Sequence, residues 1–203
     1  MRSFRRRVRL AVASLLALSA FAIAQRDYFP KKALADDSWS DQFRADWYSS
    51  ALKDMGEPSL FELATSPSAE SYRFLWLRTF HHPVAIRVDV RADGTGVLTK
   101  KVRAGSAGFP STARQVIENE SRPLLRAETQ GFLARLKIAG FWSLPGQFER
   151  GGMDGSQWII EGAKGGKYHV VDRWSPEGGA IHDLGIYLLV ELAHMNIPKS
   201  ELY

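Results

Sequence analysis

The sequence contains no cysteine among its 203 residues. Disulfide bonds, a nucleophilic thiol and thiolate metal ligands are therefore excluded. A lipid-anchored lipoprotein is excluded as well, because its lipid is carried by a cysteine at the cleavage site. An ordinary hydrophobic core must hold the fold together, and the 45% hydrophobic content of the chain is typical of a globular domain.

The chain also lacks an apolar run of the length that a membrane-spanning helix needs, which is about 20 residues. Its longest uncharged apolar run covers residues 10–24 and follows five arginines. Ala22 and Ala24 give the end of this run the small-x-small form of a cleavage site. The pattern predicts a signal peptide over residues 1–24, cleaved near Ala24, and hence a periplasmic or secreted protein. The alternative is an uncleaved segment that anchors the protein in the inner membrane.

Beyond this segment the sequence has no excess charge of either sign. The whole chain has 27 basic and 22 acidic residues, and removing the five arginines of residues 1–24 leaves 22 of each. A neutral surface argues against binding to the phosphate backbone of a nucleic acid. It also gives no reason to bind anionic lipid, so we expect membrane contact only through an uncleaved N-terminal segment.

The sequence signatures of several common enzyme sites are missing too. There is no G-x-S-x-G motif, phosphate-binding P-loop, H-E-x-x-H motif or dinucleotide fingerprint. Adjacent residues of a strand point to opposite faces, so His81 and His82 cannot bind one ion together. Glu191 and His194 have E-x-x-H spacing, but a di-metal bundle needs two such motifs. We therefore predict no metal site and no cofactor.

Two kinds of periodicity divide the rest of the sequence into helices and strands. Helices are predicted over residues 36–55, 127–138 and 180–195, and strands over residues 71–80, 84–91, 97–103, 111–120, 157–161 and 167–174. Strands follow one another rather than alternating strictly with helices, which indicates an α+β fold. After a mobile leader over residues 25–35, we expect a single domain over residues 36–203. Its antiparallel sheet is built from two hairpin units and packs against about three helices.

The second hairpin holds most of the polar groups that could bind a ligand. Glycine-rich residues 162–166 form its predicted turn. In the return strand, Tyr168 and Trp174 lie on one face, and His169 and Arg173 lie on the other. One interpretation is an ion pair between strands with solvated polar faces. The other is a surface that binds a ligand or partner, formed by Trp158, Tyr168, His169, Arg173 and Trp174.

Six tryptophans are many for a chain of this length. They could fill the core between sheet and helices, or they could form a stacking surface for a glycan or a peptide. Three at patterned positions are expected in the core, and three near turns are expected to be more exposed. The first group is Trp39, Trp47 and Trp76, and the second is Trp142, Trp158 and Trp174.

Three carboxylates of the same region offer an alternative, enzymatic interpretation. Asp154, Glu161 and Asp172 could supply the pair of acids that a glycosidase uses. Such a pair must face one cleft with its carboxyl groups about 5–9.5 Å apart. Asp154 lies in a glycine-rich loop, where function often concentrates.

Four segments carry a resemblance to known proteins. They are GMDGSQW at residues 152–158, YHVVDRWSP at 168–176, FLWLRTFHHP at 74–83 and GFWSLP at 140–145. They resemble a group of small exported bacterial proteins of uncharacterised activity, and the likeness covers most of residues 71–195. The resemblance implies an exported bacterial protein and implies no catalytic residue.

These observations lead to one predicted function and two alternatives. We predict an exported, non-enzymatic α+β protein that binds an unidentified protein or small ligand in the cell envelope. The first alternative is a cell-envelope hydrolase with paired carboxylates. The second is a membrane-anchored accessory protein, which would follow if the segment before Gln25 is not cleaved.

Overall fold

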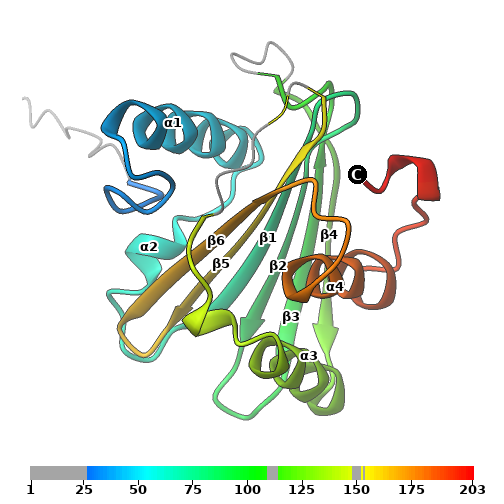
Figure 1. Cartoon of the computed structure of the whole chain (residues 1–203). Helices are drawn as coiled ribbons and strands as arrows, with labels where there is room; N and C mark the ends of the chain where they lie inside the picture. Colours follow the sequence, from blue (N-terminus) through cyan, green and yellow to red (C-terminus); the bar gives the residue numbers. More distant parts are fainter. Residues whose placement is uncertain (1–26, 109–113, 148–151, 153) are drawn as a thin grey trace, which may run out of the picture.

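The computed structural model describes residues 27–108, 114–147, 152 and 154–203 (Figure 1). The predicted signal peptide lies outside these residues, as do the first two positions of the predicted leader. Six strands form one antiparallel sheet in the order β4-β3-β2-β1-β5-β6. They are β1 (Glu70–Arg78), β2 (Val84–Val90), β3 (Gly96–Arg103), β4 (Val116–Leu124), β5 (Ser156–Lys164) and β6 (Lys167–Trp174).

Helices cover both faces of this sheet, so the fold has three layers (Figure 1). One face packs against α1 (Ser38–Asp54) and α2 (Leu60–Leu63), and the other against α3 (Arg126–Ile138) and α4 (Ala180–Ile186). After α4 the chain continues as a π-helical segment, Tyr187–Leu192. The predicted single α+β domain with an antiparallel sheet is confirmed, and its described residues form four α-helices where the sequence indicated about three.

The two predicted hairpins form the two halves of the sheet, and β1 joins them at the centre, pairing with β2 and with β5. The turn between β5 and β6 is shorter than expected. Lys164 pairs with Lys167, and only Gly165 and Gly166 lie between them, with φ of 57° and 80°. The predicted turn residue Gly162 lies inside β5, where a Cβ atom would come within 2.7 Å of the Phe141 ring. Close packing against a ring, rather than turn geometry, requires that glycine.

The central strand β1 is buried on both faces. Phe74 and Trp76 belong to the core on the α4 side, while Leu75 and Leu77 belong to the core on the α1 side. Such a nearly continuous run of apolar residues is typical of a strand that is covered on both sides. The expected place of Trp76 in the core is confirmed, since its side chain has 0% exposure.

The described part of the predicted mobile leader, residues 27–35, packs against α1. Leu34 is fully buried. The Asp41 carboxylate accepts hydrogen bonds from the backbone N–H groups of Lys32, Leu34 and Ala35 at 2.7, 2.9 and 3.2 Å. Polar groups that leave water need partners, and this one side chain satisfies three of them. The described leader is therefore an integral part of the α1 layer rather than a segment that projects from it.

Charged side chains are buried in the middle of the α1-facing side of the sheet. The Arg73 guanidinium on β1 donates to Glu161 Oε2 on β5 from Nη2 at 2.6 Å and from Nε at 2.9 Å. Glu57, which precedes α2, lies 2.9 Å from Arg87 and 3.0 Å from Lys101, and 3.6 Å from Arg73. We call these five residues the buried ionic cluster. Three cations and two anions lie together, each anion contacts at least one cation, and Arg87 pairs in addition with Asp89, so the charges away from water have partners of opposite sign.

We predict that removing one member of this cluster costs more than removing a matched pair. Arg73→Leu leaves the Glu161 carboxylate buried without its cation, and the free energy of unfolding should fall by about 3–5 kcal/mol. The double variant Arg73→Leu/Glu161→Leu should lose less, because no uncompensated charge remains. Urea unfolding of the single and double variants measures both values.

The matched control for this experiment is an exposed ion pair. Lys164 Nζ lies 2.8 Å from Glu70 Oε1 at the surface, and Lys164→Leu should change the free energy of unfolding by less than about 1 kcal/mol. If the double cluster variant loses at least as much as Arg73→Leu alone, the buried charges are not mutually compensating.

Candidate functional site

The five predicted ligand-binding residues do not form one surface, because strand alternation divides them between the two faces of the sheet. Trp158 belongs to the core on the α4 side, and Arg173 is its direct partner on β6. His169 lies on the same side as Arg173, two pleats along the strand. Tyr168 and Trp174 lie on the opposite, α1-facing side. A ligand at one face can therefore contact only part of the predicted set.

Trp158 is fully buried, so the expectation that it is one of the more exposed tryptophans was wrong. Its ring centroid lies 5.3 Å from that of Phe74 and 5.4 Å from that of Trp76. Its Nε1 donates to Ser156 Oγ at 2.8 Å. Gly185 packs so closely on the indole that a Cβ atom there would lie 2.4 Å away. The indole joins the sheet to α4 and is not available to a ligand.

His169 and Arg173 hold the loop that precedes β5. His169 Nε2 lies 3.1 Å from the Leu144 carbonyl oxygen, and burial lowers the pKa of its imidazole. Arg173 donates from Nη2 to the Pro145 carbonyl at 2.8 Å and from Nη1 to the Gly146 carbonyl at 3.3 Å. Both side chains therefore hold the backbone of residues 144–146 against β6.

The three predicted catalytic carboxylates lie in different environments. Asp154 is exposed. Glu161 belongs to the buried ionic cluster, where it also accepts a hydrogen bond from the Tyr168 hydroxyl at 2.9 Å. Asp172 is 2% exposed and lies under α1. None of the three lines either of the two pockets beside α1, so the paired-carboxylate mechanism has no groove there.

Asp172 is the most strongly perturbed of these acids. Its Oδ2 accepts hydrogen bonds from the Tyr48 hydroxyl at 2.8 Å and from Arg44 Nη1 at 3.3 Å. Its Oδ1 is buried and has no hydrogen-bond partner in the described part of the chain. Burial raises the pKa of Asp172 to about 6, although the Arg44 guanidinium opposes the shift. Arg44 also donates to the Leu34 carbonyl at 3.0 Å, so one guanidinium connects α1, the leader and β6.

We predict that this carboxylate makes the fold less stable as the pH rises from 4 to 7. The pKa of Asp172 is about 6 in the folded chain against an ordinary value of 3.8, so the folded state holds the proton more tightly. The stability that it contributes is present below pH 4 and is lost as the pH rises through 6. The loss should reach up to about 3 kcal/mol, and urea unfolding at several pH values measures it.

Asp172→Asn should remove this part of the pH dependence, because a carboxamide does not titrate. Asp154→Asn, the same change at an exposed position, should leave the pH profile of stability as it is in the unmodified chain. An Asp172→Asn variant with the original profile between pH 4 and 7 would refute the assignment.

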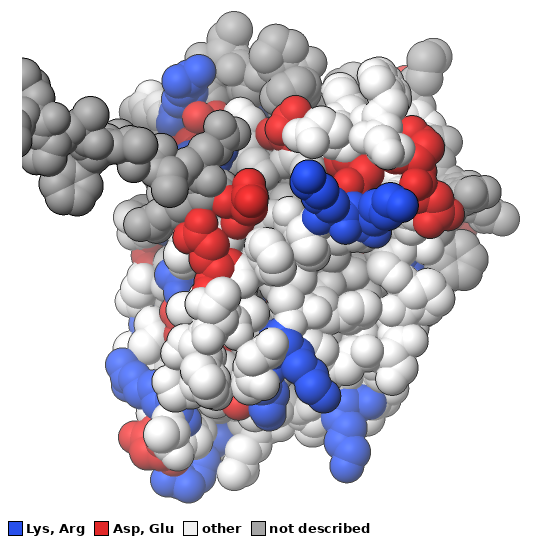
Figure 2. Space-filling view, turned by 90° about the vertical axis from the view of Figure 1, so that its left-hand side faces the viewer, with Lys and Arg blue, Asp and Glu red and all other residues white. Residues whose placement is uncertain are grey.

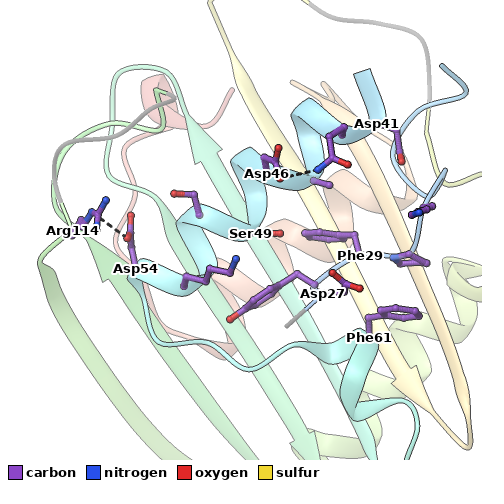
Figure 3. A pocket seen from close by; sticks show the side chains of 15 residues that line it. Asp27, Phe29, Asp41, Asp46, Ser49, Asp54, Phe61 and Arg114 are labelled. Carbon is purple, nitrogen blue, oxygen red and sulfur yellow. Dashed lines mark hydrogen bonds and ion pairs between the residues drawn. The ribbon is translucent and has the colours of Figure 1, made fainter. Parts of the chain in front are cut away.

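Two pockets lie beside α1. The larger has a volume of about 650 Å³ and lies between α1, the leader and α2 (Figure 3). Phe29 and Phe61 lie at one end in Figure 3, and the ion pair of Asp54 and Arg114 lies at the other. The Asp41 carboxylate in this pocket is already occupied by the leader. The pocket is polar and is lined by charged side chains of both signs. Some of these, such as Asp41, already stabilise the fold.

The second pocket, of about 430 Å³, lies between the N-terminal half of α1, the start of β5 and the end of β6. Its walls combine four aromatic rings with four polar side chains, of which Arg44 and Gln157 are the largest. We call it the aromatic pocket, and we define it by Trp39, Phe43, Arg44, Trp47, Gln157 and Trp174.

Three of these rings form a row along α1. Their centroids are 5.7 Å apart between Trp39 and Phe43, whose planes differ by only 6°, and 6.1 Å apart between Phe43 and Trp47. Trp39 is 76% exposed and Phe43 is 40% exposed. The expectation that Trp39 is a core residue was wrong, and Trp47 is only partly buried. The spacing of four residues correctly places these three rings on one side of α1. That side is not the buried one, because the buried side of the helix is formed around Tyr48.

The opposite wall of the aromatic pocket is closely packed. Gln157 and Trp174 are direct partners on β5 and β6. The Trp174 ring lies against the backbone at Gly152 and Gly155, where Cβ atoms would come within 2.7 and 2.6 Å of it. Of the predicted ligand-binding residues, Trp174 is the one that lines this pocket.

Gln157 lines the pocket with 6% exposure, and its carboxamide makes no hydrogen bond to the residues that the structure describes. Sequence reasoning missed Gln157, Phe43 and Arg44. One sequence signal could have indicated Gln157: it is a polar residue on the strand face that also carries the apolar Ile159.

The face that α1 and α2 form carries both signs of charge. In Figure 2, basic and acidic side chains lie in small separate groups around a broad uncharged area. No large area of one sign is visible on this face. This face therefore offers no extended field of one sign that would steer a charged molecule towards it.

No protein-family model, curated protein or solved structure matches this chain. Among the described residues, no three acidic or histidine side chains are grouped so that they could hold a metal ion. Within the same residues, no helix has the length and apolar character to cross a membrane. The function must therefore be inferred from the geometry of the pockets.

Proposed function

We propose that this chain is an exported α+β protein that binds a small ligand non-covalently in the aromatic pocket. The observation that carries the proposal is the 76% exposure of Trp39 at the edge of a pocket that three other aromatic rings line. A large apolar ring in water is unfavourable, and aromatic rings gathered around a concave site are typical of ligand recognition.

The dimensions of the pocket favour a small ligand over a protein partner. Its volume of about 430 Å³ lies within the range of about 300–1,000 Å³ that is usual for small-molecule sites. A stable protein interface needs about 800 Å² from each partner, which is far more surface than the pocket offers.

The lining of the pocket supports a binding function rather than a hydrolytic one. Its described lining includes no aspartate or glutamate. General acid and base catalysis by carboxylates requires such groups within hydrogen-bond reach of the ligand. Asp172, which contacts the lining residue Arg44, is itself bonded by Arg44 and Tyr48 and does not line the pocket.

We predict that the native chain binds the planar anionic probe 1-anilinonaphthalene-8-sulfonate at one site. The aromatic rings should stack on the naphthalene, and Arg44 should attract the sulfonate. Trp39→Ala should weaken the binding about tenfold, because it removes a stacking partner. Fluorescence titration of the folded protein measures the affinity and the stoichiometry.

Trp142→Ala is the matched control for this titration. Trp142 is also exposed, at 37%, but it packs beside His169 and lies outside the aromatic pocket. The affinity for the probe should be unchanged in this variant. Equal effects of both substitutions, or no binding of the probe to the unmodified chain, would contradict the proposed site.

The proposed location is periplasmic or secreted, and the arginine-flanked apolar run of residues 1–24 supports it. We predict a mature species that begins at Gln25, found in the periplasm or the medium. Intact mass combined with cell fractionation measures this. Leu16→Arg places a charge in the apolar run and should abolish export. A membrane-bound species that retains the N-terminal segment would show an anchored accessory protein instead.

A further inference from the structure

We propose that the ligand of the aromatic pocket is an oligosaccharide, whose sugar rings pack along the exposed side of the α1 ring row and whose polar groups pair with the Gln157 carboxamide. This inference rests on the proposed function and names the ligand class of the same site. Three features of the pocket lead to it: the carboxamide of Gln157, the single cation Arg44, and the row of three rings on α1.

The carboxamide of Gln157, which water reaches at the pocket wall, disfavours a purely apolar ligand. A carboxamide offers two N–H donors and one carbonyl acceptor. None of them is used within the described residues, and the residue as a whole is 6% exposed, so water at the pocket wall is their partner. A lipid tail in the pocket would remove water from these groups and supply nothing in exchange. The ligand must therefore carry hydrogen-bond donors and acceptors beside its apolar surface.

The charge of the pocket excludes a cationic ligand and disfavours a polyanionic one. Aromatic rings grouped in this way can bind quaternary ammonium ions through their faces. Here, however, Arg44 lines the same pocket and no described lining residue is acidic, so a cation would be repelled. The one cation is itself paired with Asp172 at 3.3 Å, which leaves little charge to bind a chain of phosphates. A neutral or weakly anionic ligand fits both facts.

The row of rings along α1 favours an oligomer over a single planar molecule. The centroids of Trp39, Phe43 and Trp47 follow one another at 5.7 and 6.1 Å. The Trp39 and Phe43 rings are nearly parallel, and Trp47 is tilted by 46° from Phe43. One planar heterocycle would use only part of this row. A chain of sugar rings has apolar faces that can pack along the exposed side of such a row, and hydroxyl groups at the edges that can reach Gln157.

The test is calorimetric titration of the full mature chain with two probes, the tetrasaccharide of N-acetylglucosamine and that of glucose. Binding of either supports the proposal, and the comparison shows whether Gln157 pairs with amide or hydroxyl groups. Trp39→Ala and Gln157→Leu should each weaken the binding about tenfold, and Trp142→Ala should leave it unchanged. Gln157→Leu should not lower the urea midpoint of unfolding, because the carboxamide has no partner in the described protein.

The outcomes separate this inference from the proposed function. If neither tetrasaccharide binds at millimolar concentration while the naphthalene probe still does, the pocket is a binding site and the ligand class is wrong. Binding of adenosine in the pocket in place of the sugars also overturns the class. Sugar binding that neither Trp39→Ala nor Gln157→Leu weakens places the sugar elsewhere and overturns the proposal.

Discussion

The ion pair between Arg73 and Glu161 sets the register on which the α1 side of the molecule depends. The two residues are directly opposite each other on β1 and β5, and neither side chain is exposed. A slip of one residue would turn Arg73 towards the apolar core on the α4 side and leave Glu161 without a cation. The cost of an unpaired buried charge is several kcal/mol, which is comparable with the whole stability of a domain. The central pairing of the sheet therefore has one acceptable register.

The same cluster determines how α1 lies on the sheet. Lys101, which neutralises Glu57, also donates to the Met55 carbonyl at 2.9 Å and so holds the C-terminal end of α1. Leu52 and Tyr48 are buried in that half of the helix, whereas its first turns are largely exposed. Arg44 in the N-terminal half is held by its contact with Asp172 instead, and Tyr48 bonds the same carboxylate from the middle of the helix. The aromatic pocket opens where the helix has polar support in place of an apolar core.

The sheet could be predicted from the sequence to a large extent, and the pocket could not. Alternation and glycine-rich turns are local signals, so the strands and the antiparallel pairing follow from them. The orientation of α1 is not local. Its aromatic stripe begins at Trp39, but the buried side is set by Tyr48 and by Asp41, a polar residue that the leader recruits. A prediction from hydrophobicity alone therefore places the rings of this stripe in the core, where the structure does not have them. Gln157 was missed for a related reason, because an amide at a pocket wall that has no partner among the described residues has no signature in sequence.

The energetics of the pocket explain why several rings are needed. A tryptophan side chain buries about 150–250 Å² when it is covered. At about 25 cal/mol per Å², covering the exposed part of Trp39 contributes about 3–5 kcal/mol, an affinity in the millimolar range before other costs. A side chain that becomes fixed on binding loses conformational entropy, which reduces the affinity. Trp174 and Trp47 add surface with less of this loss, because the backbone at Gly152 and Gly155 already packs on Trp174 and the Ala107 carbonyl already binds Trp47. A ligand that spans fixed and exposed rings together gains affinity that no single ring provides.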